Sequence, residues 1–154
     1  MNKTAILRLP GARRQKGVAA LEFALVSTVF FTLLIGVMEM GRVLFYWNTA
    51  VEATRMGARV AVVCDINASQ TTSNPVIKDM RKLLPILKPA NVTVTYLPSG
   101  CDATSCTSVT VAITNVSVNT MVPFVPFNLM MPPFSTTLPR ESLSSVGGTN
   151  PTCL

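Results

Sequence analysis

The chain has 154 residues, of which 49% are apolar and only 13% are charged. A composition this apolar indicates that part of the chain lies in a membrane and argues against a soluble single domain. The formal net charge is +6, but nearly all of the excess precedes residue 18, and basic charge confined to a leader gives no reason to expect nucleic-acid binding. The leader cations are Lys3, Arg8, Arg13, Arg14 and Lys16.

An apolar run fills residues 18–38 directly after the leader. About 20 such residues suffice to span a hydrocarbon core as a helix. No small-x-small cleavage site of a secretory signal follows the run. The leader cations place the N-terminus in the cytoplasm and the residues beyond the span outside it. The sequence therefore predicts a basic leader at 1–17 and a membrane-spanning helix that starts at residue 18.

The helical pattern continues past the membrane. Residues 40–63 contain no proline, and one stripe recurs at three- and four-residue spacing. Ala53, Gly57 and Ala61 form a second row of small residues at i, i+4 and i+8, on which another element could pack closely. We expect that element to be the chain's own outer domain, and a neighbouring chain is the alternative. The transmembrane and protruding helix is thus predicted over 18–64, with a stripe of Val43, Trp47, Val51, Thr54, Ala58 and Val62.

Residues 65–154 read as a small outer domain. A polar linker leads to a short helix over 75–87, and alternating patterns predict strands at 91–97 and 108–118 that form an antiparallel hairpin with a bulge near Asn115. The proline-rich stretch 121–134 is expected to cover the sheet before a last strand within 135–143. The predicted fold class is α+β, a long N-terminal helix with a small antiparallel-sheet domain. In the short helix Val76, Met80, Leu83, Leu84 and Leu87 fall on or near one face.

Four cysteines, Cys64, Cys101, Cys106 and Cys153, all follow the apolar run. An oxidising outer compartment favours disulfides, and three pairings are possible. Cys101 with Cys106 would staple the hairpin connection and leave Cys64 for Cys153. A four-cysteine zinc site is the alternative, but the chain has no CxxC pair, so no metal is expected.

The residue inventory argues against catalysis. The chain has no histidine, which removes Ser–His and Cys–His nucleophile pairs, and its few acids are scattered. No glycine-rich phosphate loop is present. We expect a structural or interaction protein without a cofactor, not an enzyme.

One short stretch suggests a family. Gly17 precedes "VAALEF", so that Val18 would begin a mature chain and Glu22 would be its fifth residue. With "MEMGR" and "ATRMGAR", this stretch resembles the TadE-like minor pilins, or pseudopilins, of tight-adherence (Tad) pili. The resemblance implies that a prepilin peptidase cuts after Gly17 at the bacterial inner membrane. It also implies partners among other Tad pilins and the inner-membrane assembly platform, a periplasmic outer domain, and a role in pilus assembly, adhesion and biofilm formation.

Glu22 is a costly residue for a membrane segment. A carboxylate at membrane depth needs a partner, and with the Gly17 context we expect the terminal amine of a neighbouring subunit to provide it. The plainer alternative is that Glu22 stays near the interface and snorkels into the lipid headgroups. Two other functional readings stay open. One is an uncleaved single-pass anchor that presents the outer domain to a secretion or adhesion partner, and the other is a disulfide-stabilised extracellular adhesin.

Overall fold

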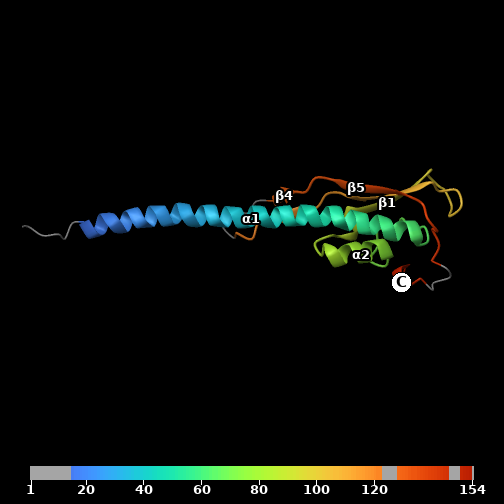
Figure 1. Ribbon diagram of the computed structural model, residues 1–154, viewed down its shortest axis with the longest axis horizontal. Coiled ribbons are helices and arrows are strands. Elements are labelled where there is room, and N and C mark those ends of the chain that lie inside the picture. Colours follow the sequence, from blue (N-terminus) through green and yellow to red (C-terminus); the bar gives the residue numbers. More distant parts are fainter. Residues whose placement is uncertain (1–14, 123–127, 146–149, 154) are drawn as a thin grey trace, which may run out of the picture. The chain divides into compact units, whose positions relative to one another are not determined.

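The computed structural model describes residues 15–122, 128–145 and 150–153 (Figure 1). The chain divides into two compact units, with the boundary between Met40 and Gly41, and the first helix runs through this boundary. The elements in chain order are α1 (Gln15–Val63), α2 (Pro75–Leu83), η1 (Pro89–Asn91), β1 (Val92–Leu97), β2 (Ser108–Ile113), β3 (Ser117–Asn119), β4 (Asn128–Met130), β5 (Phe134–Pro139) and η3 (Pro151–Cys153).

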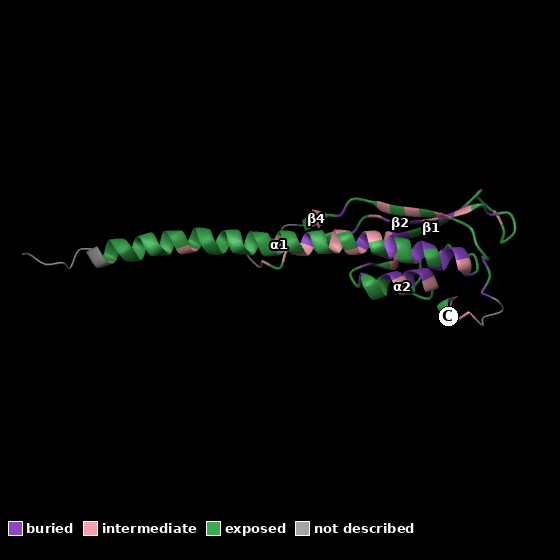
Figure 2. Cartoon of the chain, viewed as in Figure 1, coloured by how far each residue is buried: buried purple, intermediate pink, exposed green. Residues whose placement is uncertain are grey.

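The described part of the first unit is the N-terminal portion of α1. Its side chains from residue 17 to residue 38 are exposed, with only Ser27 partly covered (Figure 2). Two hydroxyls in this portion bond to the helix itself, Thr28 to the carbonyl of Ala24 at 2.8 Å and Thr32 to that of Thr28 at 2.7 Å. Polar groups satisfied within the helix suit a hydrocarbon environment, which offers no water for them.

In the second unit, the C-terminal portion of α1 packs against both α2 and the sheet (Figure 1). The Thr136 hydroxyl of β5 donates to that of Thr54 at 3.0 Å, and Thr54 donates to the carbonyl of Val51. These bonds explain how a threonine can lie in the buried stripe of the helix, since a buried hydroxyl needs partners. The predicted long N-terminal helix is confirmed, because α1 extends without a break from Gln15 to Val63.

The main sheet has the strand order β1-β2-β5, and both strand pairs are antiparallel. In β1 every second residue is buried, and Val92 pairs with Ile113 of β2 at one end of the ladder. On the other side of β2, Ile113 pairs with Phe134 of β5. The expected hairpin and last strand are therefore present, and the α+β fold class is confirmed.

The structure differs from the expected bulge near Asn115. The second strand ends at Ile113, and Asn115 adopts φ 56°, a left-handed conformation that redirects the chain. The next residues form β3, which pairs with β4 in a separate two-stranded sheet. Three-residue strands are too short to produce a recognisable alternation, so β4 was not predictable from the sequence pattern. The expectation that the proline-rich stretch covers the sheet lies partly outside the described residues, at 123–127.

The short helix is also shorter than predicted. α2 begins after the N-cap Asn74, whose side chain accepts from the backbone N–H of Val76, and it ends at Leu83 rather than at residue 87. Pro85 explains the early end, because proline disfavours helical backbone in the residue before it. Leu83 is 41% exposed, whereas the other four apolar residues assigned to its face are buried.

Candidate functional site

The candidate site is the first turns of α1. Gly17 lies in the first turn, and a Cβ atom added to it would meet nothing within 4 Å. Packing within the described chain therefore gives no reason for a glycine at this position. Val18, the next residue, is 60% exposed. The backbone on both sides of the Gly17–Val18 peptide bond is thus uncrowded by other described parts of the chain.

Glu22 lies four residues beyond Val18, about 6 Å along the helix axis. Its carboxylate has no hydrogen bond or ion pair with any residue that the structure describes. Its neighbours Leu21 and Phe23 are 62% and 75% exposed. A carboxylate is therefore presented on an otherwise apolar helix surface, and any partner for it would come from outside the described chain.

The leader charges can be placed only in part. Arg13 and Arg14 lie outside the described residues, and Lys16 belongs to α1 without a described side chain. The orientation that these charges predict stays a prediction.

Small residues of α1 explain how the second unit packs. Ala53 and Ala61 are fully buried, and a Cβ atom on Gly57 would lie 2.5 Å from Sδ of Met80 and 3.3 Å from Cγ1 of Val111. Contacts at 2.5 Å do not occur between real carbon and sulfur atoms, so this position requires glycine unless Met80 moves. The small-residue row therefore contacts α2 and β2 of the same chain, in agreement with the expectation that it seats the helix on its own domain.

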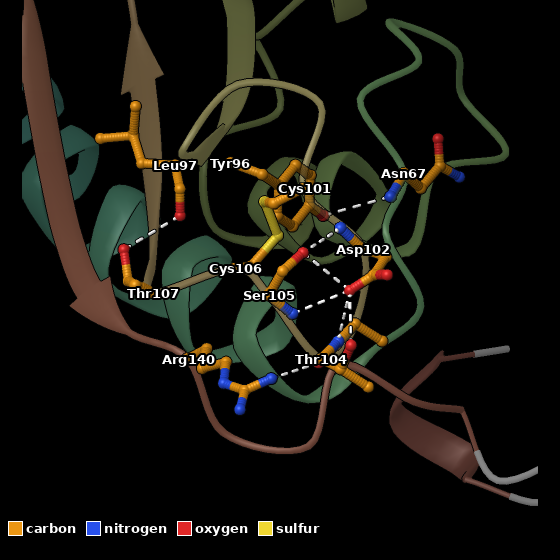
Figure 3. Close-up of a disulfide and its surroundings, with 11 residues drawn as sticks. Asn67, Tyr96, Leu97, Cys101, Asp102, Thr104, Ser105, Cys106, Thr107 and Arg140 are labelled. Carbon is orange, nitrogen blue, oxygen red and sulfur yellow. Dashed lines mark hydrogen bonds between the residues drawn. A yellow bond between two sulfur atoms is a disulfide. The ribbon is translucent and has the colours of Figure 1, made fainter.

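The Cys101–Cys106 disulfide closes the connection between β1 and β2 (Figure 3). Inside this loop the Asp102 carboxylate accepts from the hydroxyl and backbone N–H of Thr104 and of Ser105. These hydrogen bonds, the Thr104 side chain first, hold the pKa of Asp102 well below its ordinary value. Arg140 donates to the carbonyl of Ala103, which joins the loop to the segment after β5.

The Cys64–Cys153 disulfide ties the end of α1 to the C-terminal segment, with a Cα–Cα distance of 5.5 Å. A reciprocal pair of hydrogen bonds supports it, because the Asp65 carboxylate accepts from the Ser145 backbone N–H and the Ser145 hydroxyl accepts from the Asp65 backbone N–H. The first of these bonds lowers the pKa of Asp65. This is the cysteine pairing that the spacing favours. It leaves no free thiol, and in the described part of the chain no three His, Cys, Asp or Glu side chains form a metal cluster.

Arg42 contributes a contact that sequence reasoning missed. Its guanidinium donates to the backbone carbonyl of Asn119, 77 residues away, and lies 5.7 Å from the ring centroid of Tyr46. A contact with a backbone carbonyl leaves no trace in residue types, so no sequence signal would have found it. It joins the start of the second unit to the end of β3.

Comparison with known proteins identifies the same segment. Residues 17–59 match the family model described as TadE-like protein, so the resemblance inferred from the motifs is confirmed over this range. The match begins at Gly17 and ends at Arg59, and it therefore covers most of α1. No curated protein and no solved structure matches the chain. In the described residues one helix, α1, is long and apolar enough to cross a membrane, which suits a pilin-type protein with a single membrane anchor.

Proposed function

We propose that this TadE-like chain is a minor pilin or pseudopilin that is cleaved after Gly17 and takes part in the assembly or initiation of a Tad pilus, in adhesion and biofilm formation. The observation that carries the proposal is the family match over residues 17–59, which begins with an exposed apolar helix whose Glu22 carboxylate has no partner among the described residues. A structural role accounts for the chain without catalysis.

Cleavage after Gly17 explains why a glycine stands where packing does not require one. A peptidase must bring its catalytic groups close to the scissile backbone, and glycine offers no side chain to obstruct that approach. The prepilin peptidase is therefore the first proposed partner. Its cut would free the α-amino group of Val18 one helical turn before Glu22.

A neighbouring subunit would then satisfy Glu22. An unpartnered carboxylate costs about 3 kcal/mol at the centre of a membrane helix on insertion scales and less near its end, where Glu22 lies, and an amine within ion-pair distance offsets that cost. In the described chain the Val18 nitrogen belongs to the Gly17–Val18 peptide bond and offers no amine to Glu22, and after a cut the two groups of one chain would stand about 6 Å apart along the axis. We therefore assign Glu22 to pairing between subunits, among Tad pilins and on the inner-membrane assembly platform.

The proposed topology follows from the leader charges. Arg13, Arg14 and Lys16 keep the N-terminus cytoplasmic, the helix crosses the bacterial inner membrane once, and the outer domain lies in the periplasm or on the extracellular pilus. Two disulfides in the second unit suit an oxidising compartment.

The alternative function is an uncleaved anchor that presents the disulfide-stabilised domain to a secretion or adhesion partner. The size of the second unit, residues 41–154, and its own core favour this reading. The two proposals differ in the fate of the leader.

Two substitutions test the proposal. Gly17→Leu should leave a membrane protein of precursor size. Glu22→Ala should still be processed, but cells with this variant as their only copy should lack pili, because the carboxylate lies beyond the cut and is needed only between subunits. Leu25→Ala, at a 61% exposed position of the same helix, is the matched control and should support pilus assembly. Normal cutting of Gly17→Leu, or normal pili with Glu22→Ala, would favour the uncleaved anchor.

A further inference from the structure

A hollow on the surface of the second unit has no part in the functions described so far. Its volume is about 240 Å³. Two elements form it, α1 and α2, and we call it the Arg59 groove. It is lined by Glu52, Arg55, Met56, Arg59 and Leu83.

The large residues of α1 that line the Arg59 groove do not contribute to the core. The stretch "ATRMGAR", residues 53–59, divides between two sides of α1. Its alanines, threonine and glycine are buried against α2 and the sheet. Arg55, Met56 and Arg59 are all exposed, so packing within the chain explains the small residues of this stretch and leaves the three large ones unexplained.

The apolar part of the groove comes from two elements. Met56 of α1 is 42% exposed and Leu83 of α2 is 41% exposed, and both line the same hollow. Methionine is flexible and polarizable, so it can adjust its shape to an inserted side chain. An apolar floor of this kind fits one aliphatic or aromatic side chain from outside.

The polar rim of the groove carries available positive charge. Arg55 pairs with Glu52 at 2.8 Å, but both side chains are about 60% exposed, and such surface pairs are weak enough to exchange partners. Arg59 makes no hydrogen bond or ion pair with any described residue. It follows Arg55 by four residues and so lies on the same side of the helix.

We propose that the Arg59 groove binds an acidic amphipathic segment of a different protein. A carboxylate of that segment pairs with the guanidinium of Arg59, which can hold it through two parallel hydrogen bonds. An apolar side chain within one helical turn of the carboxylate inserts between Met56 and Leu83. Charge complementarity selects this occupant, because the rim carries two arginines against one glutamate and the floor excludes a purely ionic ligand.

A second copy of this chain is a poorer complement. In the described residues, the Asp102 carboxylate accepts hydrogen bonds within its own loop, and the Asp65 carboxylate accepts one from the Ser145 backbone N–H. Glu22 lies in the apolar part of α1 that is proposed to cross the membrane, and the exposed Glu141 is followed by the buried Leu143, so neither offers an acidic and an apolar side chain together to the groove. An anionic lipid surface would use the arginines and leave the apolar floor without a role. The proposed partner is therefore a protein segment, and the proposal holds whether or not the leader is cleaved.

Crosslinking in living cells tests the proposal with the full chain. The photoreactive residue p-benzoylphenylalanine replaces Met56 in one strain and Leu83 in a second. In a control strain it replaces Thr95, which is exposed on the outer face of β1. We expect both groove positions to give an adduct with one protein and the control position to give none. Mass spectrometry should map the adduct to a segment with an Asp or Glu within about one helical turn of an apolar side chain.

Reversing the charge of Arg59 provides a second test of the proposal. Arg59→Glu should reduce the adduct by about tenfold or more, whereas Lys88→Glu, a matched reversal outside the groove, should leave it unchanged. Replacing the mapped acidic residue of the partner by lysine should restore the adduct with Arg59→Glu. The faster gel mobility that the Cys64–Cys153 disulfide gives without reductant confirms that each variant folds. If Arg59→Glu does not fold, Arg59→Gln replaces it in the same experiment.

Several results would overturn the proposal. They are the lack of any adduct at the groove positions, an adduct only with a second copy or with lipid, a mapped segment without an acidic residue, and an adduct that Arg59→Glu leaves unchanged. The readout does not depend on pili, so a normal groove adduct in cells where Glu22→Ala has no effect would reject the pilin function and keep the groove.

Discussion

Gly57 offers the most direct test of how α1 is seated in the second unit. Replacing it with alanine adds one carbon atom, which would lie 2.5 Å from Sδ and 2.8 Å from Cγ of Met80. Met80 is fully buried, so it can move away only by displacing other core atoms. Val111 lies on the other side at 3.3 Å and is branched, which limits its own movement.

The expected loss combines two opposing effects. Alanine stabilises a helix interior by about 1 kcal/mol relative to glycine, whereas overpacking a close-packed core costs about 1 to 3 kcal/mol. We therefore expect Gly57→Ala to lower the free energy of unfolding by about 1 kcal/mol, which corresponds to about 4 °C in Tm for a domain of this size. In a Met80→Ala background the two crowded atoms are gone, so the same change should stabilise by up to about 1 kcal/mol. The double-mutant coupling energy is then about 2 kcal/mol.

Thermal unfolding of the full chain in detergent, followed by near-ultraviolet circular dichroism, measures these differences. Gly41→Ala is the matched control, because a Cβ atom there meets nothing within 4 Å, and it should leave Tm unchanged or raise it. A coupling energy near zero between positions 57 and 80 would refute the packing of α1 on α2 through Gly57.

Two further predictions concern the second unit. Loss of the Cys64–Cys153 disulfide, which spans 89 residues, should cost about 4.5 kcal/mol in the loop-entropy model, against about 2 kcal/mol for Cys101–Cys106, which spans 5. Guanidinium unfolding of the two double serine variants should show the larger loss in free energy of unfolding without Cys64–Cys153. A larger loss without Cys101–Cys106 would contradict this prediction. Burial raises the pKa of Tyr96, so its contribution to stability is complete below the unfolded-state pKa of about 10 and is lost as pH rises through the folded-state pKa. Tyr96→Phe should lower the free energy of unfolding by about 1 kcal/mol at pH 7, because the Tyr96 hydroxyl accepts from the Asn67 backbone N–H at 3.1 Å. Above about pH 10 the free energy of unfolding should fall less steeply with pH in the variant than in the parent. An unchanged alkaline profile would show that Tyr96 is not the responsible group.

The sequence predicted the features that depend on local pattern. The extent of α1 followed from an apolar run continued by a proline-free stripe, and the β1–β2 hairpin followed from alternation on both sides of a short connection. The cysteine pairing followed because Cys101 and Cys106 bracket that connection, which leaves one other pair.

The features that depend on tertiary contacts were not predictable in the same way. Leu83 belongs by helical periodicity to the apolar side of α2, but in the structure Met80 lies against Gly57 while Leu83 is 41% exposed and lines the Arg59 groove. The left-handed conformation of Asn115 sends the chain into a second sheet where a bulge also fitted the pattern. Periodicity cannot distinguish these outcomes, because each depends on residues far apart in the sequence.

The N-terminal residue of the protein recovered from membranes and from sheared pili tests the central claim most directly. If a prepilin peptidase cuts this chain, N-terminal sequencing and intact mass should show a mature chain that begins at Val18. The mass should also be about four hydrogens below that of the reduced form, because two disulfides are present. A chain that still carries the leader and begins at Met1 would contradict the pilin mechanism.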